Sequence, residues 1–200
     1  MSETYDIKSV LELNELLKSL TEKTSQISLT AVNAMLAARS KSAAYTSFSV
    51  VTTELREFCE QLNLQVEKVL ILIIDVVHNM SEIEKLGNTI RVLTTTELQI
   101  EKANTSNFTI VSIKEDEILI YDKLHIQLKQ LLKTLSKALL RISKHCMRGD
   151  NISVLIKVES KSGMDNSTLE LISNEVATYV VQIQDSLKHA ALKITQGMQQ

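Results

Sequence analysis

The chain has 200 residues, of which 44% are hydrophobic and 23% charged, and it contains four glycines and no proline or tryptophan. Because proline and glycine interrupt helices, their scarcity favours long helices and an all-α fold. The 22 basic and 24 acidic residues give a net charge of -2 and are spread along the chain. This balance predicts no basic stripe and argues against a nucleic-acid partner.

The first predicted helix covers the N-terminal segment up to about residue 38. Apolar residues recur there at alternating spacings of three and four, which places them on one side of a coiled-coil helix. Only Thr24 interrupts this apolar seam. The seam consists of Val10, Leu13, Leu17, Leu20, Thr24, Ile27, Ala31, Ala34 and Ala38.

A second helix is predicted from about residue 46 to residue 103, with a length of about 85 Å. The first helix is too short to cover all of it, so the rest needs another partner. Gln65 and Asn79 either set the register or oligomeric state, or lie at the solvated edge of the seam. The second seam consists of Phe48, Val51, Leu55, Phe58, Leu62, Gln65, Val69, Leu72, Val76, Asn79, Ile83, Leu86, Ile90 and Leu93.

Two further helices are predicted in the C-terminal half. A capping box of Ser112 and Glu115 marks the start of the third helix, and Gly149 marks its end as a left-handed cap. A second capping box, Ser167 and Glu170, marks the start of the fourth helix. The two seams are Tyr121, Leu124, Leu128, Leu131, Leu135, Ala138 and Ile142, and then Leu169, Ile172, Val176, Tyr179, Ile183, Leu187, Ala190 and Ile194.

The connectors near 108–113 and 152–158 leave room for two short strands. In the second connector apolar residues alternate with a period of two, which is typical of a strand, although a helix also fits so short a run. The predicted fold class is therefore all-α, an elongated antiparallel coiled-coil hairpin or four-helix bundle, with these strands as an alternative. We expect a hairpin over 1–104 and a second helical pair over 105–200 that packs on it, or one continuous bundle.

The sequence predicts no enzyme, cofactor or metal site. The histidines are scattered without a metal-binding spacing, and His145 is expected to be a cation near the end of the third helix. Cys59 is expected to be a small buried hydrophobic residue, with a redox role as the alternative. No secretory signal and no transmembrane segment are predicted, since the most apolar run, Val69 to Val77, contains Asp75 and is too short. We therefore expect a cytoplasmic protein.

Residues 27–56 resemble the signalling tip of methyl-accepting chemotaxis proteins. The segments that carry the resemblance are ISLTAVNAMLAAR, from Ile27 to Arg39, and FSVVTTELR, from Phe48 to Arg56. Without a net insertion, matching or conservatively replaced residues are Leu29, Ala31, Val32, Asn33, Ala34, Phe48, Val50, Val51, Glu54, Leu55 and Arg56.

In that family the tip binds the coupling adaptor and the histidine kinase of the chemotaxis array and makes contacts between receptor dimers. The resemblance implies partner-binding roles for Leu29, Val32, Asn33, Val50, Glu54 and Arg56. This sequence departs from the family at Ala37, where the family has glutamate, and at Arg39, which comes one position early. The turn glycines of the family are replaced by Ser42, Ala43, Ala44 and Ser47.

The resemblance implies a non-enzymatic signalling protein that acts through helix–helix contacts with a chemotaxis histidine kinase, with its coupling adaptor or with itself. Self-association as a homo-oligomer is expected because the second helix is longer than the first. Two alternatives remain open. One is a structural or interaction bundle unrelated to chemotaxis, and the other is a membrane-active helical protein that exposes residues 66–77.

Overall fold

The computed structural model describes four helices, and every residue it describes is helical. They are α1 (Ile7–Ala38), α2 (Tyr45–Lys102), α3 (Phe108–Ser162) and α4 (Asn166–Gly197). The all-α prediction is confirmed for this part of the chain, and the first, second and fourth helices begin and end close to their predicted limits. Of the residues that replace the turn glycines, Ser42, Ala43 and Ala44 lie outside the described residues, as does Arg39, and Ser47 lies in α2.

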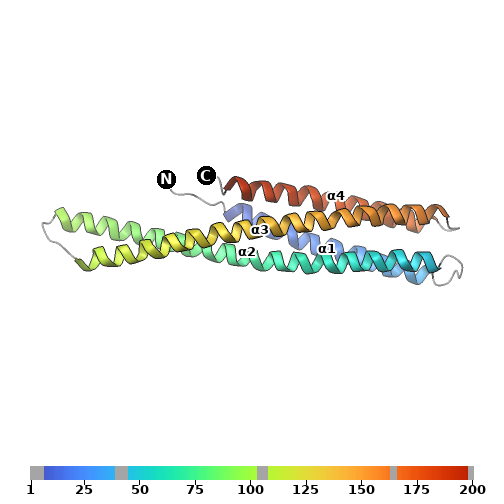
Figure 1. Ribbon diagram of the computed structural model, residues 1–200, viewed down its shortest axis with the longest axis horizontal. Helices are drawn as coiled ribbons and strands as arrows, with labels where there is room; N and C mark the ends of the chain where they lie inside the picture. The colour runs from blue at the N-terminus through green and yellow to red at the C-terminus, as the bar shows by residue number, and fades with distance from the viewer. Residues whose placement is uncertain (1–6, 39–44, 103–107, 163–165, 198–200) are drawn as a thin grey trace.

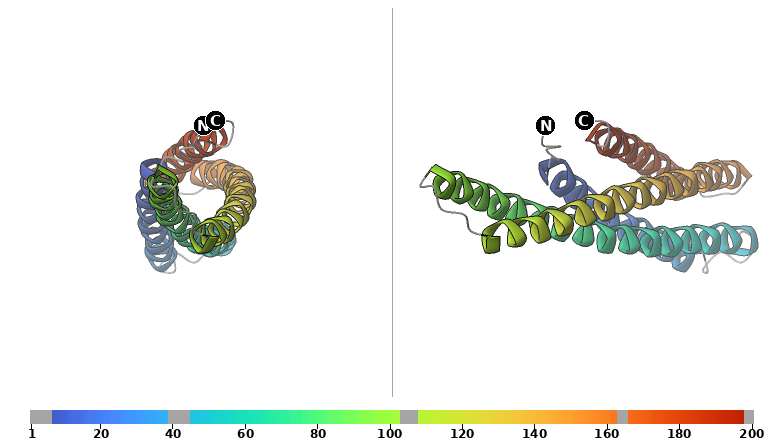
Figure 2. Two further views of the ribbon diagram at one scale, coloured as in Figure 1. Left: turned by 90° about the vertical axis from the view of Figure 1, so that its left-hand side faces the viewer. Right: turned by 60° about the vertical axis from the view of Figure 1, so that its left-hand side comes forward.

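The helices form an elongated bundle in which each helix is antiparallel to the next (Figure 1). α2 and α4 each pack along both α1 and α3, and within the described ranges no Cα atoms of α1 and α3, or of α2 and α4, lie within 8 Å of each other. Figure 2 shows the helices wrapping around one another. The end of α1, the start of α2, the end of α3 and the start of α4 all lie at one end of the molecule, here called the hairpin end.

α2 and α3 are much longer than their neighbours and continue past them as a helical pair. In α1 the hydroxyl of Thr24 donates to Asn63 Oδ1 of α2, which fixes the register of this antiparallel pair. Because the two helices are antiparallel, Asn79 of α2 lies level with Lys8 of α1, each being the same number of residues from the contact between Asn63 and Thr24. Beyond that level α1 and α4 are absent, and residues 81–102 and 108–127 form what we call the extension (Figure 1).

The core is a single cluster of buried residues drawn from all four helices. The seam predicted for α1 is buried from Val10 to Ala31, including Thr24. The buried apolar faces of α2, α3 and α4 are wider than predicted. The buried hydrophobic residues outside the predicted seams are Cys59, Val66, Ile73 and Met80 in α2, Leu132, Leu139, Cys146, Ile152 and Ile156 in α3, and Val180 in α4.

The predicted end of the third helix is wrong. α3 continues through Gly149 to Ser162, and Gly149 is buried in the helix interior rather than placed at a cap. A Cβ atom at this position would lie 2.7 Å from both Phe58 Cζ of α2 and Val180 Cγ2 of α4. The glycine is therefore needed for the close approach of three helices. Ser112 likewise lies inside α3, which begins at Phe108.

The strand alternative is also wrong, because both predicted connectors belong to α3. Ile152 and Ile156 are buried, whereas Val154 and Val158 are exposed. Each pair is separated by four residues, which is the spacing of one face of a helix. The apparent period of two therefore arises from a buried and an exposed face of one helix interleaved along the sequence.

The apolar run of α2 has one buried side and one exposed side. Val69 and Ile73 are buried in the core, while Ile71 is 61% exposed and Ile74 66% exposed. The run therefore belongs partly to the core and partly to the exposed surface of α2. No described helix has a stretch long and apolar enough to cross a membrane.

Candidate functional site at the hairpin end

The α1 residues of the predicted partner surface lie on the outer side of the bundle. Leu29 is 62% exposed, Asn33 is exposed and Val32 is half-buried. Leu29, Asn33 and the exposed Leu36 follow one another at spacings of four and three, so they form one stripe on α1. The buried Ile27 and Ala31 occupy the opposite side of the helix and hold it against the core.

The α2 residues of the predicted surface differ in their surroundings. Val50 is 60% exposed, and its side chain is an apolar group on the outside of the bundle. Glu54 is half-buried, and one carboxylate oxygen accepts a hydrogen bond of 2.6 Å from Arg148 of α3. Arg56 is exposed, and its Nε lies 3.5 Å from Glu60 Oε1 one turn later.

The six predicted residues do not form one continuous surface. Asn63 marks the side of α2 that faces α1, and Val50 lies about 140° around the helix from it at 100° per residue. By the same count Asn33 lies about 180° around α1 from Thr24, which faces α2. The α1 residues therefore point outward on one face, while Val50 is exposed on a different face and Glu54 lies on the side of α2 that faces α3.

The contacts that position Glu54 come from α3, which the sequence alone did not connect with the hairpin. Arg148 lies 2.6 Å from Glu54 and 3.7 Å from Glu57, so it holds two carboxylates of α2. The pairs are about half exposed, and such ion pairs stabilise a protein by only about 0–1 kcal/mol. Their effect is to fix the direction in which Glu54 points.

His145 is not at a helix end, so the role predicted for it is wrong. Its ring stacks on Phe58 with centroids 5.1 Å apart and planes 14° apart. Its Nε2 lies 3.3 Å from the carbonyl oxygen of Phe58. The histidine therefore packs between α2 and α3 beside Gly149, and the continuation of α3 to Ser162 explains the difference.

The two cysteines are buried, as predicted for Cys59, and neither forms a disulfide. Burial, and to a smaller extent the charge of Glu60, raises the pKa of Cys59 to about 12. Burial and the nearby Asp150 raise the pKa of Cys146 to about 12. Since the thiolate is the reactive form, both side chains are poor nucleophiles in the folded protein.

We therefore expect both thiols to react with a disulfide reagent at pH 8 only when the protein unfolds. A pKa of about 12 in place of the ordinary thiol pKa of 9.0 lowers the thiolate population about a thousandfold. The measurement compares the release of chromophore from the native protein with that from protein in guanidinium chloride. A native thiol that reacts at the unfolded rate would contradict this account of the two sites.

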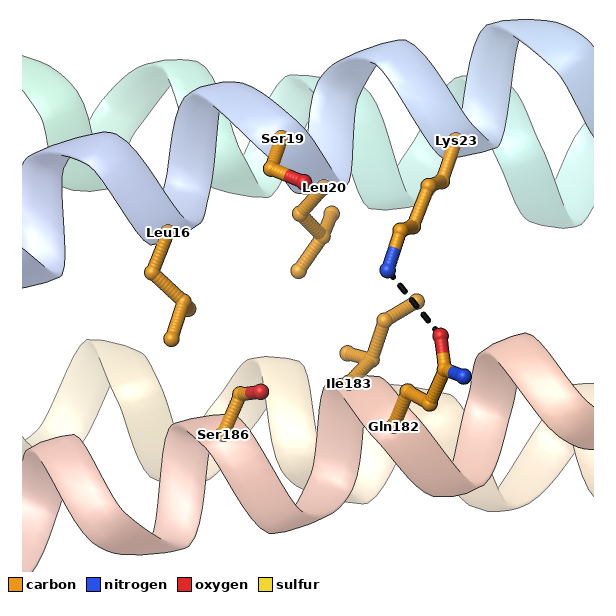
Figure 3. Close-up of a pocket in the computed structure, with 7 residues that line it drawn as sticks. All are labelled: Leu16, Ser19, Leu20, Lys23, Gln182, Ile183 and Ser186. Carbon is orange, nitrogen blue, oxygen red and sulfur yellow. Dashed lines mark hydrogen bonds between the residues drawn. The ribbon is translucent and has the colours of Figure 1, made fainter.

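A shallow groove separates α1 from α4, which share the least extensive of the four helix–helix contacts. Its volume is about 260 Å³, below the range of about 300–1,000 Å³ typical of small-molecule sites. Lys23 Nζ donates to Gln182 Oε1 across it at 3.0 Å (Figure 3). The same Nζ lies 5.8 Å from the centre of the Tyr179 ring. The groove is lined by Leu16, Ser19, Leu20, Lys23, Gln182, Ile183 and Ser186.

α3 carries a basic surface that the balanced charge of the whole chain conceals. Between residues 123 and 149 the sequence contains no aspartate or glutamate. The prediction that the chain has no basic stripe is therefore wrong, and a count of charge along each helix would have found this one. The basic residues, all exposed, are Lys123, Lys129, Lys133, Lys137, Arg141, Lys144 and Arg148.

Polar groups at other positions do not assemble into a metal site. Within the described ranges no group of three or more histidine, cysteine, aspartate or glutamate side chains is placed to hold a metal ion.

Comparisons with protein-family models, with curated proteins and with solved structures found no match to this chain.

Proposed function

We propose that this chain is a non-enzymatic, chemoreceptor-like signalling protein whose hairpin end binds a chemotaxis histidine kinase or its coupling adaptor. The observation that supports the proposal is the antiparallel packing of α1 against α2 on either side of residues 39–44. Leu29, Asn33 and Val50, which match the signalling tip of the family, stand exposed on the outside of this hairpin.

The proposed contacts are helix–helix contacts that bury exposed apolar side chains. Burying a leucine or valine side chain contributes about 1.5–3 kcal/mol, so Leu29 and Val50 are the expected anchors. Asn33 beside Leu29 supplies a polar group that selects the partner. Because the α1 stripe and the α2 residues lie on different faces, one hairpin end has room for two different partners.

The decisive experiment is co-purification of the chain with a purified chemotaxis kinase and with a purified adaptor. We expect the wild type to bind, and Asn33→Arg with Val50→Glu to weaken binding at least about tenfold, because charges replace neutral contact groups. A control introduces the same two charges at the other end of α4 as His189→Arg with Leu192→Glu, where both residues are exposed. The control should bind like the wild type.

Failure of the wild type to bind either protein would end the chemotaxis proposal. The remaining candidate would then be a structural or interaction bundle unrelated to chemotaxis. The ion pair between Glu54 and Arg148 favours this second candidate, since it directs a predicted contact residue toward α3. If the α4 control loses as much binding as Asn33→Arg with Val50→Glu, the hairpin end is not the contact surface.

Self-association is the second part of the proposal, and the extension is the surface we assign to it. Its seam residues Leu86, Ile90 and Leu93 are only half-buried, because no third or fourth helix covers them. Packing two extensions together would bury these residues in a four-helix arrangement. Light scattering over a range of concentrations should give twice the chain mass of 22.4 kDa, and a constant monomer mass would exclude this part.

A further inference from the structure

The outer side of α3 combines its basic residues with a row of exposed apolar side chains that winds slowly around the helix. Residues seven apart differ by only about 20° around a helix, so a heptad spacing gives a row along one side. These apolar residues are between 54% and 62% exposed. The row consists of Leu119, Ile126, Leu140, Met147 and Val154, with Lys133 in the one remaining heptad position.

Basic residues flank the middle of this row. Lys123, Lys137 and Lys144 follow Leu119, Lys133 and Leu140 by four residues each, which places them in the adjacent column of the same helix, with Gln130 between the first two lysines. All three lysines are exposed. The exposed acidic residues Glu115 and Asp122 lie beside Leu119, so the surface combines cationic side chains with apolar ones from Lys123 to Arg148, which pairs with Glu54.

We propose that this outer side of α3 binds an anionic lipid surface and lays the bundle flat on a membrane. Between residues 122 and 150 both columns beside the row carry polar or charged residues, so this part of α3 offers no groove for a partner helix, which would need two adjacent apolar columns. A lipid surface needs no groove. Lysine side chains reach the phosphates and carboxylates of the headgroups, while side chains such as Leu140 and Met147 enter the outermost apolar layer.

The distribution of charge along the chain also supports an anionic lipid surface as the binding partner. The basic segment of α3 is attracted to a negative surface, while the excess acidic charge of the rest of the chain is repelled by it. Only one orientation of the bundle therefore brings the protein close, with α3 toward the lipid. Clusters of four to eight lysines and arginines on an amphipathic helix are typical of binding to anionic lipids.

The test is co-sedimentation of the 200-residue chain with phosphatidylcholine vesicles that contain or lack phosphatidylserine. We expect binding only to vesicles with phosphatidylserine, and weaker binding as salt is raised. Lys133→Glu, Lys137→Glu and Lys144→Glu together should weaken binding by more than about tenfold. The matched control reverses three exposed lysines elsewhere, Lys68, Lys102 and Lys188, and should retain binding.

A second variant tests the apolar row separately from charge. Leu140→Ser with Met147→Ser should weaken vesicle binding without lowering the melting temperature, because both side chains are exposed. Absence of binding to phosphatidylserine vesicles overturns the proposal. An equal loss of vesicle binding in the α3 lysine variant and in the control lysine variant also overturns the proposal, because it would show that only the net charge matters. Equal binding of the serine variant and the wild type, with tight binding of both to soluble polyglutamate, would assign the surface to an acidic polypeptide.

Discussion

Gly149→Ala should destabilise the protein by about 2 kcal/mol, although alanine normally stabilises a helix relative to glycine by about 1 kcal/mol. The added Cβ would lie 2.7 Å from Phe58 Cζ and from Val180 Cγ2, and overpacking of a core costs about 1–3 kcal/mol or more. Phe58 cannot move aside easily, since it is fully buried and stacked on His145. Thermal unfolding followed by circular dichroism should show a melting temperature about 4–8 °C lower.

Gly87→Ala provides the matched control within the same protein. Gly87 also lies inside a helix, but a Cβ there would meet Tyr121 Cε2 at 3.5 Å, an ordinary contact distance. This substitution should stabilise the protein by up to about 1 kcal/mol. Phe58→Leu introduced into Gly149→Ala should recover part of the lost stability, because it removes the ring that the new Cβ meets. Equal stabilisation by both alanine variants would contradict the packing described for Gly149.

Asn79→Leu should raise the stability of the protein by about 1–3 kcal/mol. Asn79 is a buried seam residue, and its Oδ1 accepts no hydrogen bond from any described residue. A buried polar group without a partner costs about 1–3 kcal/mol, and leucine at a seam position removes that cost and adds apolar burial. The measurement is again the melting temperature, at a fixed protein concentration because self-association also changes it.

Asn63→Leu is the control for the chemistry of this exchange. Asn63 Oδ1 accepts a hydrogen bond from the hydroxyl of Thr24. The substitution removes this hydrogen bond and should lower the stability of the protein by about 1 kcal/mol. Opposite signs for the two asparagines are therefore expected. If Asn79→Leu also lowers the melting temperature, the amide of Asn79 makes a contact outside the single chain. The predicted role of such residues in setting oligomeric state would then apply to it.

The helical seams were predictable because a heptad pattern is a local property of the sequence. The residues of α1 from Val10 to Ala31 are buried in the predicted order. Gln65 and Asn79 do not lie at a solvated edge, since an amide oxygen of each is buried without a hydrogen bond from the described residues. The sequence could not distinguish these alternatives, because the neighbours that bury the two amides come from other helices.

The end of α3 was not predictable from local signals. Lysine and histidine followed by glycine suit a helix terminus, but the same glycine also suits a close contact between helices. The choice depends on Phe58 and Val180, which lie far away in the sequence. The pairing of Arg148 with Glu54 has the same origin, because it requires the register of α2 against α3.

The candidate surface was predictable as a set of exposed residues but not as two separate faces. The heptad pattern leaves Leu29, Asn33 and Val50 outside the seams, and the structure places them on the exterior. Which face of the bundle each one joins depends on the sides on which α1 and α3 approach α2. Those directions follow from the packing of all four helices.

The short outer helices bring the beginning and the end of the described chain together partway along the molecule (Figure 1). The contact of Lys23 with Gln182 sets α1 and α4 in a register that brings Lys8 level with Gly197. A fluorescent protein attached at either terminus would therefore lie partway along the elongated bundle and leave both ends of the bundle accessible. A short peptide joining the two termini would suffice to build a circularly permuted chain, with new ends between Lys102 and Phe108.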